Sequence, residues 1–72
     1  MTGSEAKAWR LRLGIRQTKL CWDLALEPGL VCKWESGVAR LRPEAIESIE
    51  KYLQVHLTEM HALQFPERVE SQ

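Results

Sequence analysis

The sequence predicts an all-α fold, a compact bundle of four or five helices, and three observations support this class. Glycine and proline divide the chain into segments, and each segment carries apolar residues at helical spacing. No stretch shows the apolar–polar alternation of a half-buried strand, and no segment repeats another. The 72 residues suffice for one core but not for two domains. We therefore expect one domain over residues 1–63 and a flexible tail over residues 64–72.

Three short helices are expected in the first half of the chain. Thr2 and Glu5 have the spacing of a capping box, which predicts a helix from about residue 3 to residue 13 that ends at Gly14. A second helix is expected over residues 17–24. The third begins at Pro28, because proline loses no hydrogen bond at the first helical position, and it ends before Gly37. The side chains that helical spacing directs towards the core are Ala6, Trp9, Arg10, Leu13, Leu20, Cys21, Leu24, Val31 and Trp34.

A long fourth helix is expected from residue 43 to residue 63. With His56 as the exception, apolar residues fill the a and d positions of a heptad pattern there, namely Ile46, Ile49, Leu53, Met60 and Leu63. Whether residues 54–63 continue this helix or turn into a fifth helix stays open. The stripe is longer than one small core requires. It therefore also predicts a homodimer interface formed by Leu53, Leu57 and Met60.

Composition and segment lengths argue against several classes of protein. The sequence has no apolar run of transmembrane length and no secretory signal, so we expect a cytoplasmic protein. A chain of this size seldom encloses a substrate, and no acid–base pair or nucleophile–base set is apparent. We therefore expect neither an enzyme nor a cofactor. Two cysteines are too few for a disulfide scaffold or a zinc site, so no bound metal is expected either.

The charges are divided unevenly along the chain, although the net charge is zero. Residues 1–43 carry a net charge of +4, and residues 44–72 carry −4. This division predicts a face that binds a polyanion and another end that stays away from it. A chance fluctuation of charge in a short chain is the alternative explanation.

The stretch from Leu13 to Gly37 resembles the helix-turn-helix of the lambda-repressor-like Cro/XRE family of DNA-binding domains. The positions that match the family pattern, which ends in Trp-Glu-x-Gly, are Leu13, Gly14, Ile15, Gln17, Leu20, Leu26, Val31, Trp34, Glu35 and Gly37. Residues 43–55 are similar to the fourth helix of that family. The resemblance covers about residues 4–60, and it implies that the third helix enters the major groove of DNA.

The resemblance implies roles for individual polar residues. Arg10 and Glu35 correspond to an ion pair that ties the first helix to the third. Lys33 corresponds to a position that reads a base, where a lysine can donate to guanine. The residues that the resemblance places at the DNA, by base or phosphate contact, are Arg16, Gln17, Gly29, Leu30, Lys33, Arg40 and Arg42.

The start of the third helix departs from the family pattern. Relatives often carry Gln, Ser or Arg there, whereas this chain has Pro28 and Gly29, whose side chains cannot read a base. Glu27 replaces the usual Ser or Thr cap and would repel phosphate unless it accepts a hydrogen bond from cytosine. Leu30 can contact a thymine methyl group. Few side chains are therefore expected to read bases directly, and specificity would come from Lys33, Leu30 and the shape of the DNA.

The tryptophans have different expected roles. Trp34 is expected in the core. Trp9 and Trp22 align with positions that usually face solvent in relatives, so they indicate either a contact surface for a protein partner or packing beneath the C-terminal helix.

The cysteines and histidines are expected to be structural rather than chemical. Cys21 and Cys32 replace small residues, which favours buried packing over redox sensing. His56 and His61 do not share a helix face well enough to chelate a metal ion.

We therefore expect a DNA-binding transcriptional regulator, a Cro-like repressor of the XRE family that regulates its own operon. It would bind a palindromic operator through the major groove as a homodimer. The alternative is a helix-turn-helix module for protein interaction, antitoxin-like or polymerase-binding, with weak or no direct DNA readout. Its partner would bind through Trp9, Trp22 or the C-terminal helix.

Overall fold

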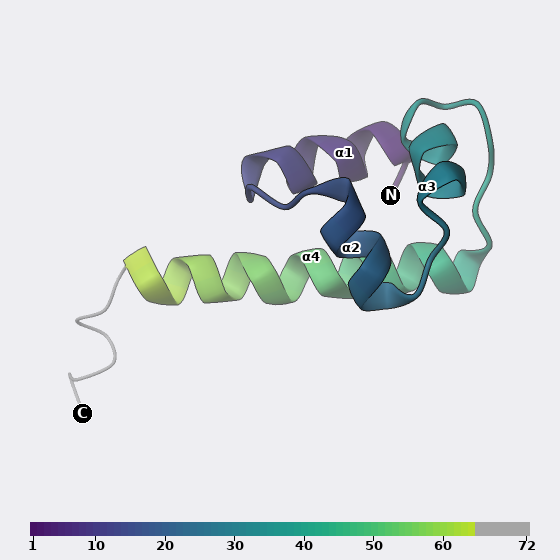
Figure 1. Cartoon of the computed structure of the whole chain (residues 1–72). Coiled ribbons are helices and arrows are strands. Elements are labelled where there is room, and N and C mark those ends of the chain that lie inside the picture. Colours follow the sequence, from purple (N-terminus) through teal and green to yellow (C-terminus); the bar gives the residue numbers. More distant parts are fainter. Residues whose placement is uncertain (65–72) are drawn as a thin grey trace.

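The computed structural model describes residues 1–64, with the side chains of residues 1–60, and these residues form four α-helices and no strand (Figure 1). The helices are α1 (Gly3–Arg12), α2 (Gln17–Leu24), α3 (Pro28–Glu35) and α4 (Pro43–Gln64). The predicted all-α class and the predicted extents of all four helices are confirmed. Of the tail expected over residues 64–72, only Gln64 lies within the described residues, and it ends α4.

The capping box predicted at the start of α1 is present. The Thr2 hydroxyl accepts a hydrogen bond from the backbone N–H of Glu5 at 3.2 Å, and the Glu5 carboxylate accepts one from the backbone N–H of Thr2 at 2.8 Å. Two N–H groups that have no partner inside the helix are satisfied in this way. At the other end Gly14 has a φ of 73°, which turns the chain away from the helix axis.

A three-residue turn joins α2 to α3, and it contains an unusual backbone conformation. Ala25 has a φ of 56°, in the left-handed region that favours glycine. Pro28 occupies the start of α3 as predicted, and Glu27 is its N-cap residue without a side-chain capping bond. The turn therefore holds α2 and α3 at a fixed angle at some cost in backbone strain.

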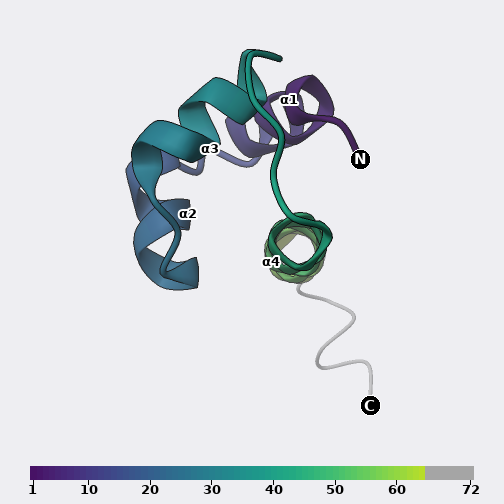
Figure 2. The same cartoon turned by 90° about the vertical axis from the view of Figure 1, so that its right-hand side faces the viewer.

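The last helix, α4, is a single helix of 22 residues, so residues 54–63 continue it and do not form a fifth helix. In Figure 1 it runs beneath α1 and behind α2, and it extends well beyond the end of α1. Figure 2 shows α4 end-on, with α2 and α3 together on the other side of the molecule. Among the described residues, no helix combines the length and the apolar character that crossing a membrane requires.

The core lies between α4 and the three short helices. Trp34 is 6% exposed, as expected, and Trp9, Leu13 and Leu24 pack partly buried at the edge of the core. The buried apolar side chains are Ala6, Ile15, Leu20, Cys21, Val31, Trp34, Leu41, Ile49 and Leu53. Every helix contributes to this set, so the burial of apolar area stabilises all four together.

A polar contact ties α2 to α4 at the edge of the core. The Tyr52 hydroxyl donates to the Asp23 carboxylate, which also forms an ion pair with Lys19 at 2.8 Å. Hydrogen bonds from Lys19 and Tyr52 lower the pKa of Asp23. Burial and the neighbouring Asp23 raise the pKa of Tyr52 to about 12, so its hydroxyl stays protonated and keeps donating well above neutral pH.

Close approach of α1 to α3 depends on Gly3. A Cβ atom at this position would lie 1.9 Å from the carbonyl oxygen of Trp34 and 2.9 Å from the Cα atom of Glu35. Because both neighbours are backbone atoms, no side-chain rotation can make room for it. Glycine at position 3 thus lets the start of α1 lie directly against the end of α3.

We expect Gly3→Ala to destabilise the fold by about 1–3 kcal/mol, because α1 or α3 must shift to accommodate the added methyl group. The free energy of unfolding in urea measures this loss. Gly29→Ala is the matched control, since a Cβ there meets no atom within 4 Å, and it should be neutral or slightly stabilising. Equal stability of the two variants would contradict the close approach.

Candidate nucleic-acid interface

The two faces of α3 have different surroundings. Val31, Trp34 and Glu35 point into the molecule and are buried. The exposed residues of the helix are Pro28, Gly29, Leu30, Cys32 and Lys33, and Gly29, Cys32 and Lys33 share one face at i, i+3 and i+4 with the C-cap residue Ser36 at i+7. Lys33 is the charged residue of this face, and Leu30, 39% exposed, lies near it at the start of the helix.

A buried ion pair holds α3 against α1, as the sequence resemblance implied. Arg10 donates from Nε and Nη2 to the two carboxylate oxygens of Glu35, each at 3.0 Å. Its third nitrogen, Nη1, donates to the carbonyl oxygen of Ile15 at 2.8 Å. The two residues are 7% and 5% exposed, and no buried side-chain N or O atom of the described residues lacks a partner. Such complete pairing is what makes a buried charge pair tolerable.

The same network includes Gln17, which the sequence predicted at a DNA phosphate. Its amide Nε2 donates to Glu35 Oε1 at 3.1 Å, and the side chain is partly buried. One of its two amide N–H groups is therefore committed inside the protein, and the second is the donor that remains for a phosphate. Gln17 links the start of α2 to the end of α3.

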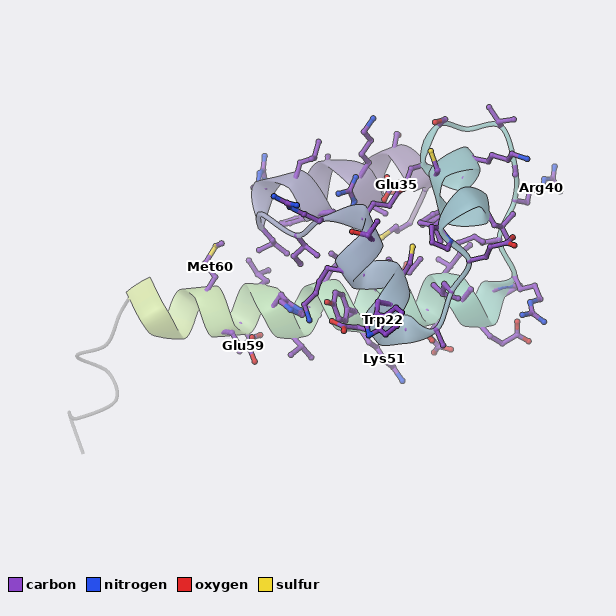
Figure 3. All side chains as sticks on the ribbon, in the orientation of Figure 1. Trp22, Glu35, Arg40, Lys51, Glu59 and Met60 are labelled. Atoms are coloured by element: carbon purple, nitrogen blue, oxygen red, sulfur yellow. The ribbon has the colours of Figure 1, made fainter. Side chains whose placement is uncertain are left out.

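Four other predicted contact residues are exposed cations. Arg16 occupies the N-cap position of α2 without a side-chain capping bond, Lys33 lies on the outer face of α3, and Arg40 and Arg42 lie in the loop that leads to α4. Figure 3 shows Arg40 projecting outward from this loop. None of the four forms an ion pair with another described residue, whereas Lys19 pairs with Asp23. Their charges are available to an external anion.

The start of α3 presents little side-chain chemistry, as its sequence indicated. Pro28 and Gly29 are exposed, and the space around Gly29 is open. Glu27 is exposed beside them and does not cap the helix with its carboxylate. This end of the helix can approach another surface closely, but it offers one negative charge and few groups that discriminate bases.

The structure distinguishes the two expected roles of the tryptophans. Trp9 packs partly buried between α1 and α4, with the guanidinium of Arg12 5.2 Å from its ring centre. Trp22 is 87% exposed on α2. An apolar hollow at the α2–α3 turn adjoins it, lined by Thr18, Cys21, Trp22, Ala25, Leu26 and Pro28.

The expectation of two buried cysteines is correct for Cys21 and wrong for Cys32. Burial raises the pKa of the Cys21 thiol, which lies in the core. Cys32 is exposed beside Lys33, because it follows Val31 on the outer side of α3. Among the residues that the structure describes, no group of three or more His, Cys, Asp or Glu side chains lies together as a metal site would require.

The residues expected at a dimer interface differ in exposure. Leu53 is 4% exposed and belongs to the core of its own chain, which leaves almost none of its surface for a second copy. Leu57 and Met60 are partly exposed on the part of α4 that follows Leu53. Any contact with a second copy would therefore begin beyond Leu53.

Two features that position α2 and α3 were not identified from the sequence. The left-handed conformation of Ala25 has a signal, because the Cro/XRE pattern carries a glycine at this position. The Tyr52–Asp23 hydrogen bond has none, because its partners are 29 residues apart and both are ordinary surface residue types.

Comparisons with protein-family models, with curated proteins and with solved structures found no match to this chain. The assignment of function therefore depends on the residues and geometry described above.

We expect Glu35→Gln to cost about 3–5 kcal/mol, because the guanidinium of Arg10 would remain buried without a counter-charge. A chain of this length has a total stability on the order of 4–10 kcal/mol, so the variant should be at best marginally folded. Urea unfolding followed by circular dichroism measures the loss. Glu27→Gln, at an exposed position, is the control and should change stability by less than about 0.5 kcal/mol. A comparably small loss for Glu35→Gln would show that the pair is dispensable.

Proposed function

We propose that this chain is a DNA-binding transcriptional regulator in which α2 and α3 act as a helix-turn-helix. The observation that carries the proposal is a set of four exposed cations on α3, at the start of α2 and in the loop after α3, none of them in an ion pair with another described residue: Lys33, Arg16, Arg40 and Arg42. The one carboxylate of α3, that of Glu35, is buried and neutralised by Arg10. The outer face is therefore positive, and this favours the phosphates of DNA.

In this proposal α3 lies in the major groove. Lys33 donates to a base edge, and Leu30 contacts a thymine methyl group. Arg16, Arg40 and Arg42 bind phosphates on either side and fix the orientation of the helix. Because Pro28 and Gly29 are small, the backbone of α3 approaches the groove closely, and part of the specificity comes from groove shape.

The regulator would act as a homodimer on a palindromic operator, because one copy has few base contacts. A two-fold pair places two copies of α3 about 34 Å apart on one side of the duplex, which doubles the contacts. Leu57 and Met60 on α4 are the proposed interface residues. Occupation of a promoter by such a dimer would repress transcription, and its own promoter is the first candidate.

A second candidate function, a protein-interaction module, is favoured by one observation. Trp22 is 87% exposed beside an apolar hollow, and an exposed aromatic of this kind is typical of a binding surface. The anionic Glu27 and the small side chains at the start of α3 agree with this candidate. Protein interaction becomes the proposed function in place of DNA binding if the experiment below finds no affinity for DNA.

We expect Lys33→Ala to lower the affinity for the operator by about 5- to 100-fold. The affinity for a scrambled duplex should change little. Arg40→Ala and Arg42→Ala should instead weaken binding to both duplexes and reduce its salt dependence. Fluorescence anisotropy at two salt concentrations, with duplex from upstream of the gene, measures these affinities. Lys51→Ala, an exposed lysine of α4, is the control and should bind as the unaltered protein does. Absence of binding to either duplex would favour the protein-interaction module.

We expect Met60→Asp to convert a dimer into a monomer, since it places a charge in the proposed apolar interface. Sedimentation equilibrium should give twice the chain mass of 8.3 kDa for the unaltered protein and the single mass for the variant. Thr58→Asp, which adds the same charge at an exposed position of α4, should remain dimeric. A single mass for the unaltered protein would remove the dimer from the proposal.

A further inference from the structure

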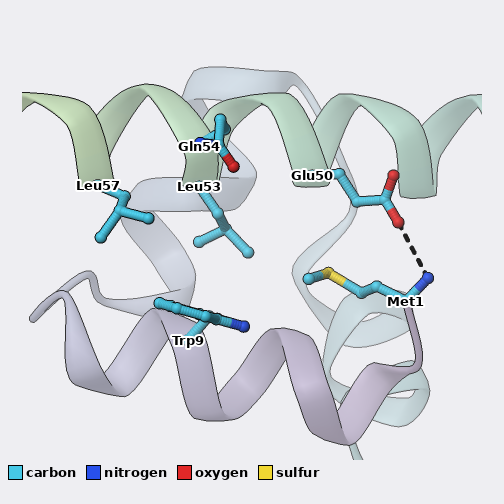
Figure 4. A pocket seen from close by; sticks show the side chains of 6 residues that line it. All are labelled: Met1, Trp9, Glu50, Leu53, Gln54 and Leu57. Carbon is cyan, nitrogen blue, oxygen red and sulfur yellow. Dashed lines mark hydrogen bonds and ion pairs between the residues drawn. The ribbon is translucent and has the colours of Figure 1, made fainter.

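A groove runs between α1 and α4, and its walls come from both helices. One hollow of about 310 Å³ is lined by Met1, Trp9, Glu50, Leu53, Gln54 and Leu57. A second hollow continues along α4 towards its start and shares two of these residues, with a lining of Met1, Pro43, Glu44, Ile46, Glu47 and Glu50. Figure 4 shows the first hollow between the two helices.

The groove combines an apolar floor with an acidic rim. Trp9, Leu53 and Leu57 form the floor of the first hollow, and Ile46 continues it in the second. Glu44, Glu47 and Glu50 stand along the rim on successive turns of α4, and neither lining includes a lysine or an arginine. An apolar strip beside three carboxylates is complementary to a segment that carries apolar and cationic side chains together.

The protein already places one group of this chemistry in the groove. The Met1 side chain lies in the first hollow beside Trp9, and its ammonium group forms an ion pair with Glu50 at 2.9 Å (Figure 4). The hydrogen bond to Glu50 raises the pKa of this amine. An apolar side chain and a cation therefore lie together here, and lysine and arginine side chains combine the same two kinds of group.

We propose that the α1–α4 groove binds a basic amphipathic segment of a partner protein. A helix of that segment would place apolar side chains on Trp9, Ile46 and Leu57, which are partly exposed. Its lysines or arginines would meet the rim carboxylates, of which Glu44 and Glu47 form no ion pair with another described residue. This goes beyond DNA binding and does not depend on it. The two linings carry three carboxylates and no lysine or arginine, so we expect the complementary cations on a partner protein, and a second copy is the other occupant that the test distinguishes.

The probe is a synthetic helix-forming peptide of about 16 residues, with leucines at i, i+3, i+4 and i+7 and lysines elsewhere. Its companion has glutamate at every lysine position. Fluorescence anisotropy of the labelled peptides with the full chain should show saturable binding of the basic peptide alone. Glu47→Lys should weaken this binding about fivefold. Glu59→Lys makes the same charge change on α4 outside both linings, and it should change binding less than twofold.

A second pair of variants tests the apolar floor. Leu57→Ser should lower the affinity for the basic peptide about tenfold. Val55→Ser, on an exposed side of α4, should change this affinity less than twofold. Circular dichroism confirms that all variants are folded. Operator binding by Glu47→Lys is measured in parallel, because Glu47 belongs to neither the proposed DNA contacts nor the proposed dimer interface, so that loss of peptide binding is distinguished from loss of DNA binding.

Three results would overturn the proposal. Equal weakening by Glu47→Lys and Glu59→Lys would show that only the overall charge of α4 attracts the peptide. Equal binding of the acidic peptide would show that charge does not matter. Self-association of the unaltered chain that Glu47→Lys abolishes and Met60→Asp leaves in place would identify a second copy as the occupant.

Discussion

The structure depends most on the ion pair between Arg10 and Glu35. Both side chains are buried, so each would destabilise the fold if the other were absent. Arg10 also donates a hydrogen bond to the carbonyl oxygen of Ile15 after α1, and Glu35 also accepts one from the side-chain amide of Gln17 at the start of α2. One charge pair therefore fixes the relative positions of α1, α2 and α3. The close contact of Gly3 with the end of α3 requires the same arrangement.

This pairing also determines how charge is distributed over the surface. With Glu35 neutralised inside the molecule, residues 27–42 present three exposed cations against the one exposed carboxylate of Glu27, whereas α4 carries four carboxylates and one lysine. These two parts of the chain thus present surfaces of opposite charge. A small domain with zero net charge can in this way present one surface to a polyanion and another to a basic partner.

Local sequence patterns predicted most of the fold, and long-range contacts account for what they missed. The capping box, Pro28 and the glycines gave the helix bounds, because these residues act within one turn of the backbone. The Tyr52–Asp23 contact and the fit of Gly3 against Trp34 depend on how helices meet, which spacing does not reveal. Heptad spacing likewise does not show what an apolar side chain packs against, so Leu53 was expected at a dimer interface although it lies in the core of its own chain. At the candidate site, the family resemblance implied that Lys33 faces outward, and Lys33 is exposed on α3.

The three tryptophans differ widely in solvent exposure, so their fluorescence can report on three different parts of the protein. Trp34 lies in the core, Trp9 lines the α1–α4 groove, and Trp22 stands almost fully in water on α2. Indole emission moves to shorter wavelength in apolar surroundings, so each ring has its own spectral signature. Chains that keep a single tryptophan would separate unfolding, occupation of the groove and events at α2 into three optical signals without an added label.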